Sequence, residues 1–127
     1  MLFRSVEMVS ENMQATLDAA LLSKMNQRDQ IRHCLIDGPL AFDNAISLES
    51  ATHKGIRSDV AGDTDLLLMP DIEVGNVLYK SLVFFAHAGV AAVILGATAP
   101  IVLTSRSDSD QAKYYSIVLA AAITRKE

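Results

Sequence analysis

The sequence predicts an α/β fold, a three-layer α/β/α sandwich built around a mostly parallel mixed sheet. Helical patterns alternate with short apolar runs along the chain, and short polar connections join them. The apolar runs show little strict alternation, which is typical of strands covered on both faces. Because 127 residues suit one hydrophobic core, we expect a single α/β domain over residues 1–127.

Apolar residues that recur at three- and four-residue intervals predict four helices. We expect these helices over residues 12–25, 43–53, 72–88 and 111–123. The residues that suit their ends are Asn12 and Asp43 as N-caps, Lys54-Gly55 after the second helix, Asp71 before the third and Gly89 after it. The expected buried positions are Val74, Val77, Leu78, Leu82 and Phe85 in the third helix and Tyr114, Ile117, Ala120 and Ala121 in the last.

Four short runs have the composition of buried strands. They span residues 31–36, 65–69, 91–95 and 101–104. Strands joined through helices favour parallel pairing, whereas the last two runs have no helix between them and can pair antiparallel. Three of the strand ends carry polar clusters, and ligands of such sheets gather at the carboxyl ends of strands.

Composition excludes several classes of function. The formal net charge of −4 argues against broad binding to nucleic acid or anionic membranes. No apolar run is long enough to span a membrane, and the first residues do not form a secretory signal. The single cysteine, Cys34, lies in an apolar run, so we expect a cytoplasmic chain without disulfides, in which this thiol fills the core.

The stretch from Ile101 to Asp110 is the strongest candidate site. An apolar strand ends there in three serines, Arg106 and two carboxylates, directly before a helix. Free N–H groups at a helix start and a guanidinium both bind anions, so the loop is predicted to hold a phosphate or acyl-phosphate group. The alternative is a simple helix start, capped by Asp108 or Ser109, with Asp108 and Gln111 forming a capping box. The two interpretations are compatible.

Other polar residues have two interpretations each. Asp37, at a strand end, either forms a turn or serves as a site carboxylate. Gly75 inside a helix indicates close approach by a ligand or by another part of the chain. Asn76 and Lys80 share one helix face, where Lys80 either binds a phosphate or is simply solvated. The three histidines lack metal-ligand spacing, and the glycine-rich motifs of nucleotide sites are absent, so we predict no metal and no bound cofactor.

Four separated blocks resemble the phosphate acetyl/butyryltransferase family. They are residues 13–20 (MQATLDAA), 37–45 (DGPLAFDNA), 70–80 (PDIEVGNVLYK) and 100–109 (PIVLTSRSDS). The forms Asp-Gly-Pro and Thr-Ser-Arg-Ser-Asp are closer to the butyryl branch than to the acetyl branch. The resemblance covers the chain from about residue 6.

The resemblance implies an enzyme that exchanges an acyl group between coenzyme A and inorganic phosphate, with no metal or redox cofactor. It also implies a fold similar to isocitrate and isopropylmalate dehydrogenases, with two domains flanking a cleft, and a homodimer. The family's chains are much longer, and this sequence corresponds to their C-terminal part. We therefore expect this stretch alone to be inactive or nearly so, because half of the cleft is absent.

The chemistry of acyl transfer suggests roles for residues of the Ile101–Asp110 stretch. Arg106 suits the phosphate and the developing charge, and Ser105 suits a hydrogen bond to the thiolate or oxyanion. Asp108 is the predicted general base, although the acetyl branch places its acid nearer the position of Ala112. The predicted substrate-binding residues are Asp37, Asn76, Lys80 and Ser107.

Two other functions stay open at this point. One is phosphate acetyltransferase activity, and the other is a non-catalytic module that senses acyl-CoA or forms a dimer. Saturable binding of coenzyme A separates a pure dimerisation module from both the enzyme and the sensor.

Overall fold

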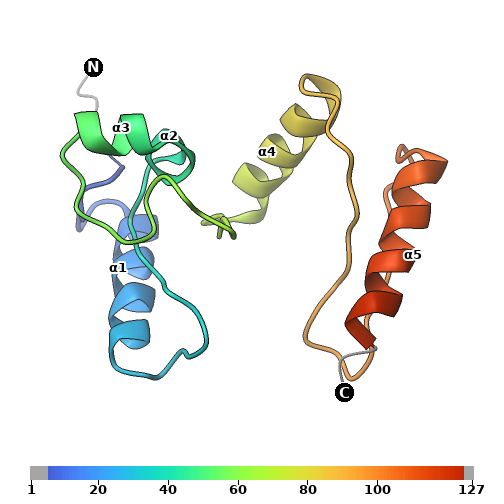
Figure 1. The fold of residues 1–127 in the computed structure, drawn as a ribbon, viewed down its shortest axis with the longest axis horizontal. Helices are drawn as coiled ribbons and strands as arrows, with labels where there is room; N and C mark the ends of the chain where they lie inside the picture. Colours follow the sequence, from blue (N-terminus) through green and yellow to red (C-terminus); the bar gives the residue numbers. More distant parts are fainter. Residues whose placement is uncertain (1–5, 125–127) are drawn as a thin grey trace. The chain divides into compact units, whose positions relative to one another are not determined.

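A computed structural model describes residues 6–124 of the chain (Figure 1). It divides into two compact units, residues 1–70 and residues 71–127. The first unit contains α1 (Gln14–Gln27), α2 (Phe42–Ile46) and α3 (Leu48–His53), and the second contains α4 (Ile72–Phe84) and α5 (Asp110–Thr124). Within residues 6–124, every helix is too short or too polar to span a lipid bilayer.

Helix α1 confirms the first predicted helix, with a different start. Met13, rather than Asn12, occupies the N-cap position and makes no side-chain cap bond. Thr16 in the first turn compensates, because its buried hydroxyl accepts a hydrogen bond from Ser10 N (2.9 Å) and donates to Met13 O (2.8 Å). The preceding segment is thereby fastened to the helix.

The segment after α1 is an irregular loop and not the predicted strand over residues 31–36. The side chain of Asn26 forms hydrogen bonds with three backbone groups of this loop. Its Nδ2 donates to Ile31 O (3.0 Å) and to Cys34 O (2.9 Å), and its Oδ1 accepts from Ile36 N (3.0 Å). Cys34 is exposed, so the prediction of a core thiol was wrong. A side chain that satisfies the loop's polar groups leaves none for a strand partner.

The predicted helix over residues 43–53 is interrupted at Ser47, which ends α2 and caps α3. Ser47 has extended backbone angles (φ −130°, ψ 112°), and its Oγ accepts a hydrogen bond from Ser50 N (3.2 Å). Asp43 lies inside α2 instead of capping it, whereas Lys54 and Gly55 close α3 as predicted. A serine that offers a new cap makes this break favourable.

A small core of alanines packs α2 against α3 and the loop that follows. The buried apolar residues are Ala41, Ala45, Ala51 and Ala61. Gly62 N donates to Ala45 O (3.0 Å), and its positive φ of 87° brings it close to Leu48. A Cβ there would lie 2.6 Å from Leu48 Cα, so only glycine fits.

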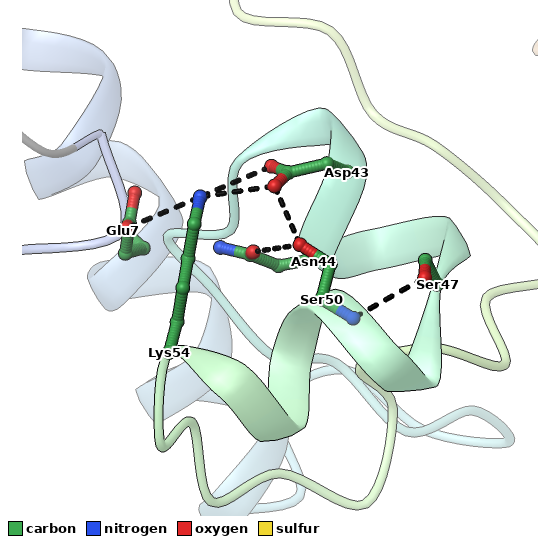
Figure 2. Close-up of polar contacts among 6 residues, drawn as sticks. All are labelled: Glu7, Asp43, Asn44, Ser47, Ser50 and Lys54. Carbon is green, nitrogen blue, oxygen red and sulfur yellow. Dashed lines mark hydrogen bonds and ion pairs between the residues drawn. The ribbon is translucent and has the colours of Figure 1, made fainter.

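A polar cluster joins these two helices to the chain's beginning (Figure 2). Lys54 Nζ lies 3.0 Å from Asp43 Oδ2 and 3.5 Å from Glu7 Oε1, while Ser50 Oγ donates to Asp43 Oδ2 (2.5 Å). Asn44 beside them is fully buried, and within the described part of the chain its Nδ2 has no hydrogen-bond partner. The hydrogen bonds from Ser50 and Lys54 lower the pKa of Asp43.

Helix α4 begins as predicted and ends earlier. Asp71 caps it, with Oδ1 accepting from Val74 N (2.7 Å), but the helix stops at Phe84 and does not reach Gly89. The expected apolar stripe is not covered within the described residues. Phe85, for example, is 86% exposed.

Of the predicted sheet, residues 6–124 contain one isolated antiparallel bridge, and the rest of the predicted runs have no regular secondary structure. This bridge joins Ile94 and Ile101, with N···O distances of 2.8 and 3.4 Å, and it agrees with the antiparallel pairing expected for the runs 91–95 and 101–104. The run 65–69 has no regular secondary structure, and its Leu66 and Leu68 are 82% and 74% exposed. A strand forms only against a partner strand, and the described residues offer these runs no others.

Helix α5 spans the predicted range, but it does not bury the predicted residues. Tyr114 and Ile117 are exposed, and the buried residue is Ser116. The Ser116 hydroxyl donates to Ala112 O (2.7 Å) and accepts from Ala92 N (2.9 Å). A hydroxyl, rather than an apolar side chain, therefore fastens α5 to the extended segment around Ala92.

Candidate anion-binding loop

The loop from Thr104 to Ser109 carries four of the predicted site residues, Ser105, Arg106, Ser107 and Asp108, and folds back on itself. Ser105 N donates to Asp108 Oδ2 (2.7 Å), and Asp108 N donates to Ser105 O (3.1 Å). The hydroxyls of Ser105 and Ser107 lie 3.0 Å apart, within hydrogen-bond distance. These contacts form the turn that presents Arg106 and place both serine hydroxyls side by side.

Ser109 caps α5, which decides between the two caps that the sequence allowed. Its Oγ accepts a hydrogen bond from Ala112 N (3.2 Å), and its carbonyl accepts from Lys113 N (3.1 Å). The predicted capping box does not form, because the Asp108 carboxylate accepts bonds elsewhere and the Gln111 side chain donates to the Tyr115 hydroxyl (2.8 Å). Within residues 6–124, the Asp108 carboxylate therefore forms no hydrogen bond with the first turn of α5.

Arg106 is exposed at the tip of this turn. Within residues 6–124 its guanidinium forms no hydrogen bond or ion pair. A cation near a helix N-terminus is repelled by the helix dipole, so the position is unfavourable for a structural charge. The same position suits a guanidinium that binds an anion together with the loop's serines.

Tyr79 joins α4 to the loop, and sequence reasoning assigned it no role. Its hydroxyl donates to Asp108 Oδ1 (2.9 Å). This hydrogen bond is the main reason that the pKa of Tyr79 is raised, and burial adds to it. The spacing of Tyr79 from Gly75 and Asn76, four and three residues, could have revealed it, because residues at this spacing share a helix face.

Two neighbouring cavities lie along this face of α4. One, of about 400 Å³, is lined by Ile72, Gly75, Asn76, Tyr79, Lys80 and Ser105. It brings together two of the predicted binding residues, Asn76 and Lys80, with the predicted catalytic Ser105. Gly75 lines this cavity, and the close approach of a ligand or of another part of the chain to it stays a prediction.

The other cavity, of about 330 Å³, lies between the C-terminal part of α4 and the start of α5. Lys80, Ser107 and Asp108 line it, and Tyr79 and Lys80 contribute to both cavities. The Lys80 ammonium lies 5.3 Å from the centre of the Tyr79 ring and 5.8 Å from that of Phe84. Both rings stabilise the cation at this place through cation–π attraction.

Asp37 belongs to the other unit of the chain. Its Oδ1 accepts a hydrogen bond from Gly38 N (2.8 Å), which is the turn-forming contact that one interpretation of the sequence predicted. The carboxylate is exposed. Its predicted role in substrate binding stays a prediction.

Comparison with known proteins places these residues in context. A profile of the family described as phosphate acetyl/butaryl transferase matches residues 2–121. The chain belongs to this family. The recognition made from the four sequence blocks is thereby confirmed.

Relatives of both branches are similar to the chain. A phosphate acetyltransferase of Thermotoga maritima is 56% identical over 117 residues, which are 92% of this chain and 40% of that protein. A probable phosphate butyryltransferase of Bacillus subtilis is 59% identical over 116 residues, 91% of this chain and 39% of that protein. The chain therefore spans about two fifths of the length of these family members.

A solved member of similar structure supports the fold class. The crystal structure of a branched-chain phosphotransacylase from Enterococcus faecalis V583 matches with a TM-score of 0.83 and 37% identity. The match covers 95% of this chain and 44% of that one. This likeness supports an α/β fold for the chain.

Proposed function

We propose that the chain is part of an acyltransferase that exchanges a short acyl group between coenzyme A and inorganic phosphate. The observation that carries the proposal is the turn at Ser105–Asp108, where Arg106 has no partner among the described residues and lies in the sequence between two serines whose hydroxyls are 3.0 Å apart. Family membership supplies the reaction: butyryl-CoA and phosphate give butyryl phosphate and coenzyme A.

In this reaction a phosphate oxygen attacks the thioester carbonyl carbon. A carbon–oxygen bond forms, the tetrahedral oxyanion collapses, the carbon–sulfur bond breaks and coenzyme A leaves as a thiolate. Arg106 would hold the phosphate with two parallel N–H donors and stabilise the negative charge that develops. The hydroxyl of Ser105 would donate to the oxyanion or to the departing sulfur.

The neighbouring cavities would hold the rest of the substrates. Lys80 and Asn76 offer a fixed cation and an amide beside Ser105, and Ser107 adds a hydroxyl on the other side of the turn. These groups suit the phosphates and the amide-rich arm of an acyl-CoA molecule. Asp37 lies in the other unit of the chain, and its role in substrate binding stays a prediction.

The base that removes the thiol proton in the reverse reaction is less directly supported. Asp108 is the carboxylate within the turn that contains Ser105 and Arg106, but both of its oxygens already accept a hydrogen bond. Its role as a base stays a prediction, and its contacts favour a role in orienting the turn.

For the whole protein we propose the architecture that the family resemblance implies. This is a three-layer sandwich with a mostly parallel mixed sheet, similar to isocitrate and isopropylmalate dehydrogenases, in a cytoplasmic homodimer. The extended segments at residues 65–69, 91–95 and 101–104 would then join strands that this stretch does not contain. The two units would form one α/β domain of a longer acyltransferase.

Phosphate acetyltransferase activity is the second candidate. The observation that favours it is the 56% identity to the acetyltransferase of Thermotoga maritima, close to the 59% identity to the probable butyryltransferase. Acyl-chain length is therefore the property that the experiment has to measure.

The test follows release of the coenzyme A thiol from acetyl-, butyryl- and branched-chain acyl-CoA by the full-length protein that carries this sequence. We expect release only when phosphate is present, with higher kcat/KM for the four-carbon substrate. Higher kcat/KM for acetyl-CoA would select the second candidate. Saturable coenzyme A binding without turnover would indicate an acyl-CoA sensor and contradict the proposal.

A further inference from the structure

The hydrogen bond between Tyr79 and Asp108 joins two elements that carry different parts of the proposed site. We infer that Tyr79 is a positioning residue, which acts through Asp108 to hold Ser105 and its turn beside α4. This inference rests on the proposed function and adds a residue to it.

The contacts form a short chain from helix to turn. The Tyr79 hydroxyl donates to Asp108 Oδ1 (2.9 Å), and the other oxygen, Oδ2, accepts from Ser105 N (2.7 Å). Within residues 6–124, no second hydrogen bond joins α4 to residues 104–109. The placement of Ser105 relative to α4 therefore depends on this one carboxylate and the phenol that fixes it.

The Tyr79 ring also contacts the cationic side of the site. It lines both cavities, and the Lys80 ammonium lies 5.3 Å from its centre. One side chain thus orders the serine turn through its hydroxyl and the lysine through its ring. Replacing tyrosine by phenylalanine removes the first contact and leaves the second.

The same contacts make Asp108 an orienting group. Each carboxylate oxygen accepts one hydrogen bond from the chain, from the Tyr79 hydroxyl on one side and from Ser105 N on the other, so the carboxylate is held in one orientation between helix and turn. A tyrosine hydroxyl, with an ordinary pKa of about 10, is protonated at neutral pH, so the donor is present there, and the hydrogen bond to Asp108 raises the pKa of Tyr79 further. Asp108 then resembles the carboxylates that orient catalytic groups without exchanging protons.

The kinetic test compares Tyr79→Phe, Asp108→Asn and the double variant in the full-length protein. We expect each single variant to lower kcat by about tenfold, the effect of losing one hydrogen bond to a charged group. The double variant should lose little more, since both changes break the same connection. Tyr115→Phe is the matched control, because among residues 6–124 the Tyr115 hydroxyl forms a hydrogen bond with Gln111 of the same helix alone. This variant should leave kcat unchanged.

A second measurement reads the turn directly. Amide hydrogen exchange at Ser105 should become about tenfold faster in Tyr79→Phe, because Asp108 loses the partner that fixes its carboxylate. Exchange within α5, for example at Ser116, should stay the same in that variant. Unchanged exchange at Ser105 would overturn the inference regardless of activity.

The pH profile separates positioning from base catalysis. In the reverse reaction, from acyl phosphate and coenzyme A, raising the pH toward the thiol pKa would restore Asp108→Asn if the aspartate were the base, because the thiolate then forms without help. We expect no such recovery, and parallel profiles for Tyr79→Phe and Asp108→Asn. Recovery of Asp108→Asn together with normal kcat in Tyr79→Phe would overturn the inference and leave the proposed function intact. An inactive parent protein would refute the proposed function, while the exchange data would still decide whether Tyr79 fixes the turn.

Discussion

At the scale of single residues, the first unit depends on a charge cluster centred on Asp43. Hydrogen bonds from Ser50 and Lys54 lower the pKa of this carboxyl, and Asp43 in turn raises the pKa of Lys54. Both groups are partly exposed, with side-chain exposures of 51% for Asp43 and 39% for Lys54, so the pair contributes modestly. The directions of the two pKa shifts nevertheless determine how the stabilisation by this pair changes with pH.

Asp43→Asn should destabilise the protein near neutral pH and have little effect in acid. A carboxyl whose pKa is lower in the folded state stabilises above its unfolded pKa, near 4, and loses this contribution as pH falls through the folded value. Thermal unfolding of the parent and the variant, from neutral pH to about pH 3, measures the difference. Asp59→Asn, an exposed change without partners among residues 6–124, is the control. A difference in Tm that grows toward acid would contradict the assignment.

At the scale of elements, α4 is the helix that organises the candidate site. Its N-cap, Asp71, fixes where the helix begins, and one face then presents Gly75, Asn76, Tyr79 and Lys80 to the cavities. Glycine inside a helix costs about 1 kcal/mol relative to alanine, so its presence requires a compensating benefit. Room for a ligand in the cavity that Gly75 lines would be such a benefit.

Gly75→Ala should therefore stabilise the protein while weakening substrate binding. We expect the free energy of unfolding to rise by about 0.5–1 kcal/mol, because alanine favours the helix, and KM for acyl-CoA to rise because the methyl group enters the cavity. Denaturant unfolding and steady-state kinetics measure the two effects. Ser81→Ala, on a part of α4 that lines neither cavity, should leave KM unchanged. A destabilised Gly75→Ala with normal KM would mean that the glycine serves packing.

The helices could be predicted from the sequence and the sheet only in part. Periodicity and caps such as Asp71 are local signals, and they located α1, α4 and α5. The break at Ser47 and the loop that Asn26 stabilises were not predicted, because each depends on one polar side chain whose hydrogen bonds replace regular backbone pairing. Strand pairing depends on partners distant in sequence, so composition identifies a run without showing what it pairs with.

At the scale of the whole molecule, the described part of the chain leaves much apolar surface uncovered. The most exposed large apolar residues include Leu35, Leu66, Leu68, Ile72 and Phe85, each more than 70% exposed. Soluble proteins rarely leave contiguous apolar surface open to water. The apolar content of 50% had indicated the same from sequence alone.

We therefore expect the protein to self-associate. Sedimentation velocity at tens of micromolar should show a species heavier than the monomer, in agreement with the proposed homodimer. Replacing Leu66 and Leu68 by glutamine should shift the protein toward monomer if this extended run contributes to the interface. A single monomeric species of the parent protein over that concentration range would contradict the expectation.

The candidate site could be predicted from sequence as a loop but not as a network. The abrupt change from an apolar run to Ser105, Arg106 and Ser107 is visible in one dimension, and the structure brings Asn76 and Lys80 beside Ser105. The link through Tyr79 joins residues 29 positions apart, which no local pattern reveals. The sequence identifies Asp108 only as a carboxylate in the loop, whereas the structure shows that its two oxygens accept hydrogen bonds from Tyr79 and Ser105.

The most direct test of the central claim is the steady-state kinetics of Arg106→Ala with varied phosphate, beside a melting curve. We expect acyl transfer to fall by about a hundred- to thousandfold, since a positioned donor for developing charge is lost. Stability should change by less than about 0.5 kcal/mol, because the side chain is exposed and unpaired among residues 6–124. Arg106→Lys should recover part of the rate, because an ammonium lacks the paired donors, and Arg57→Ala should have no effect. Normal turnover and normal phosphate KM in Arg106→Ala would show that the turn only caps α5 and would contradict the account.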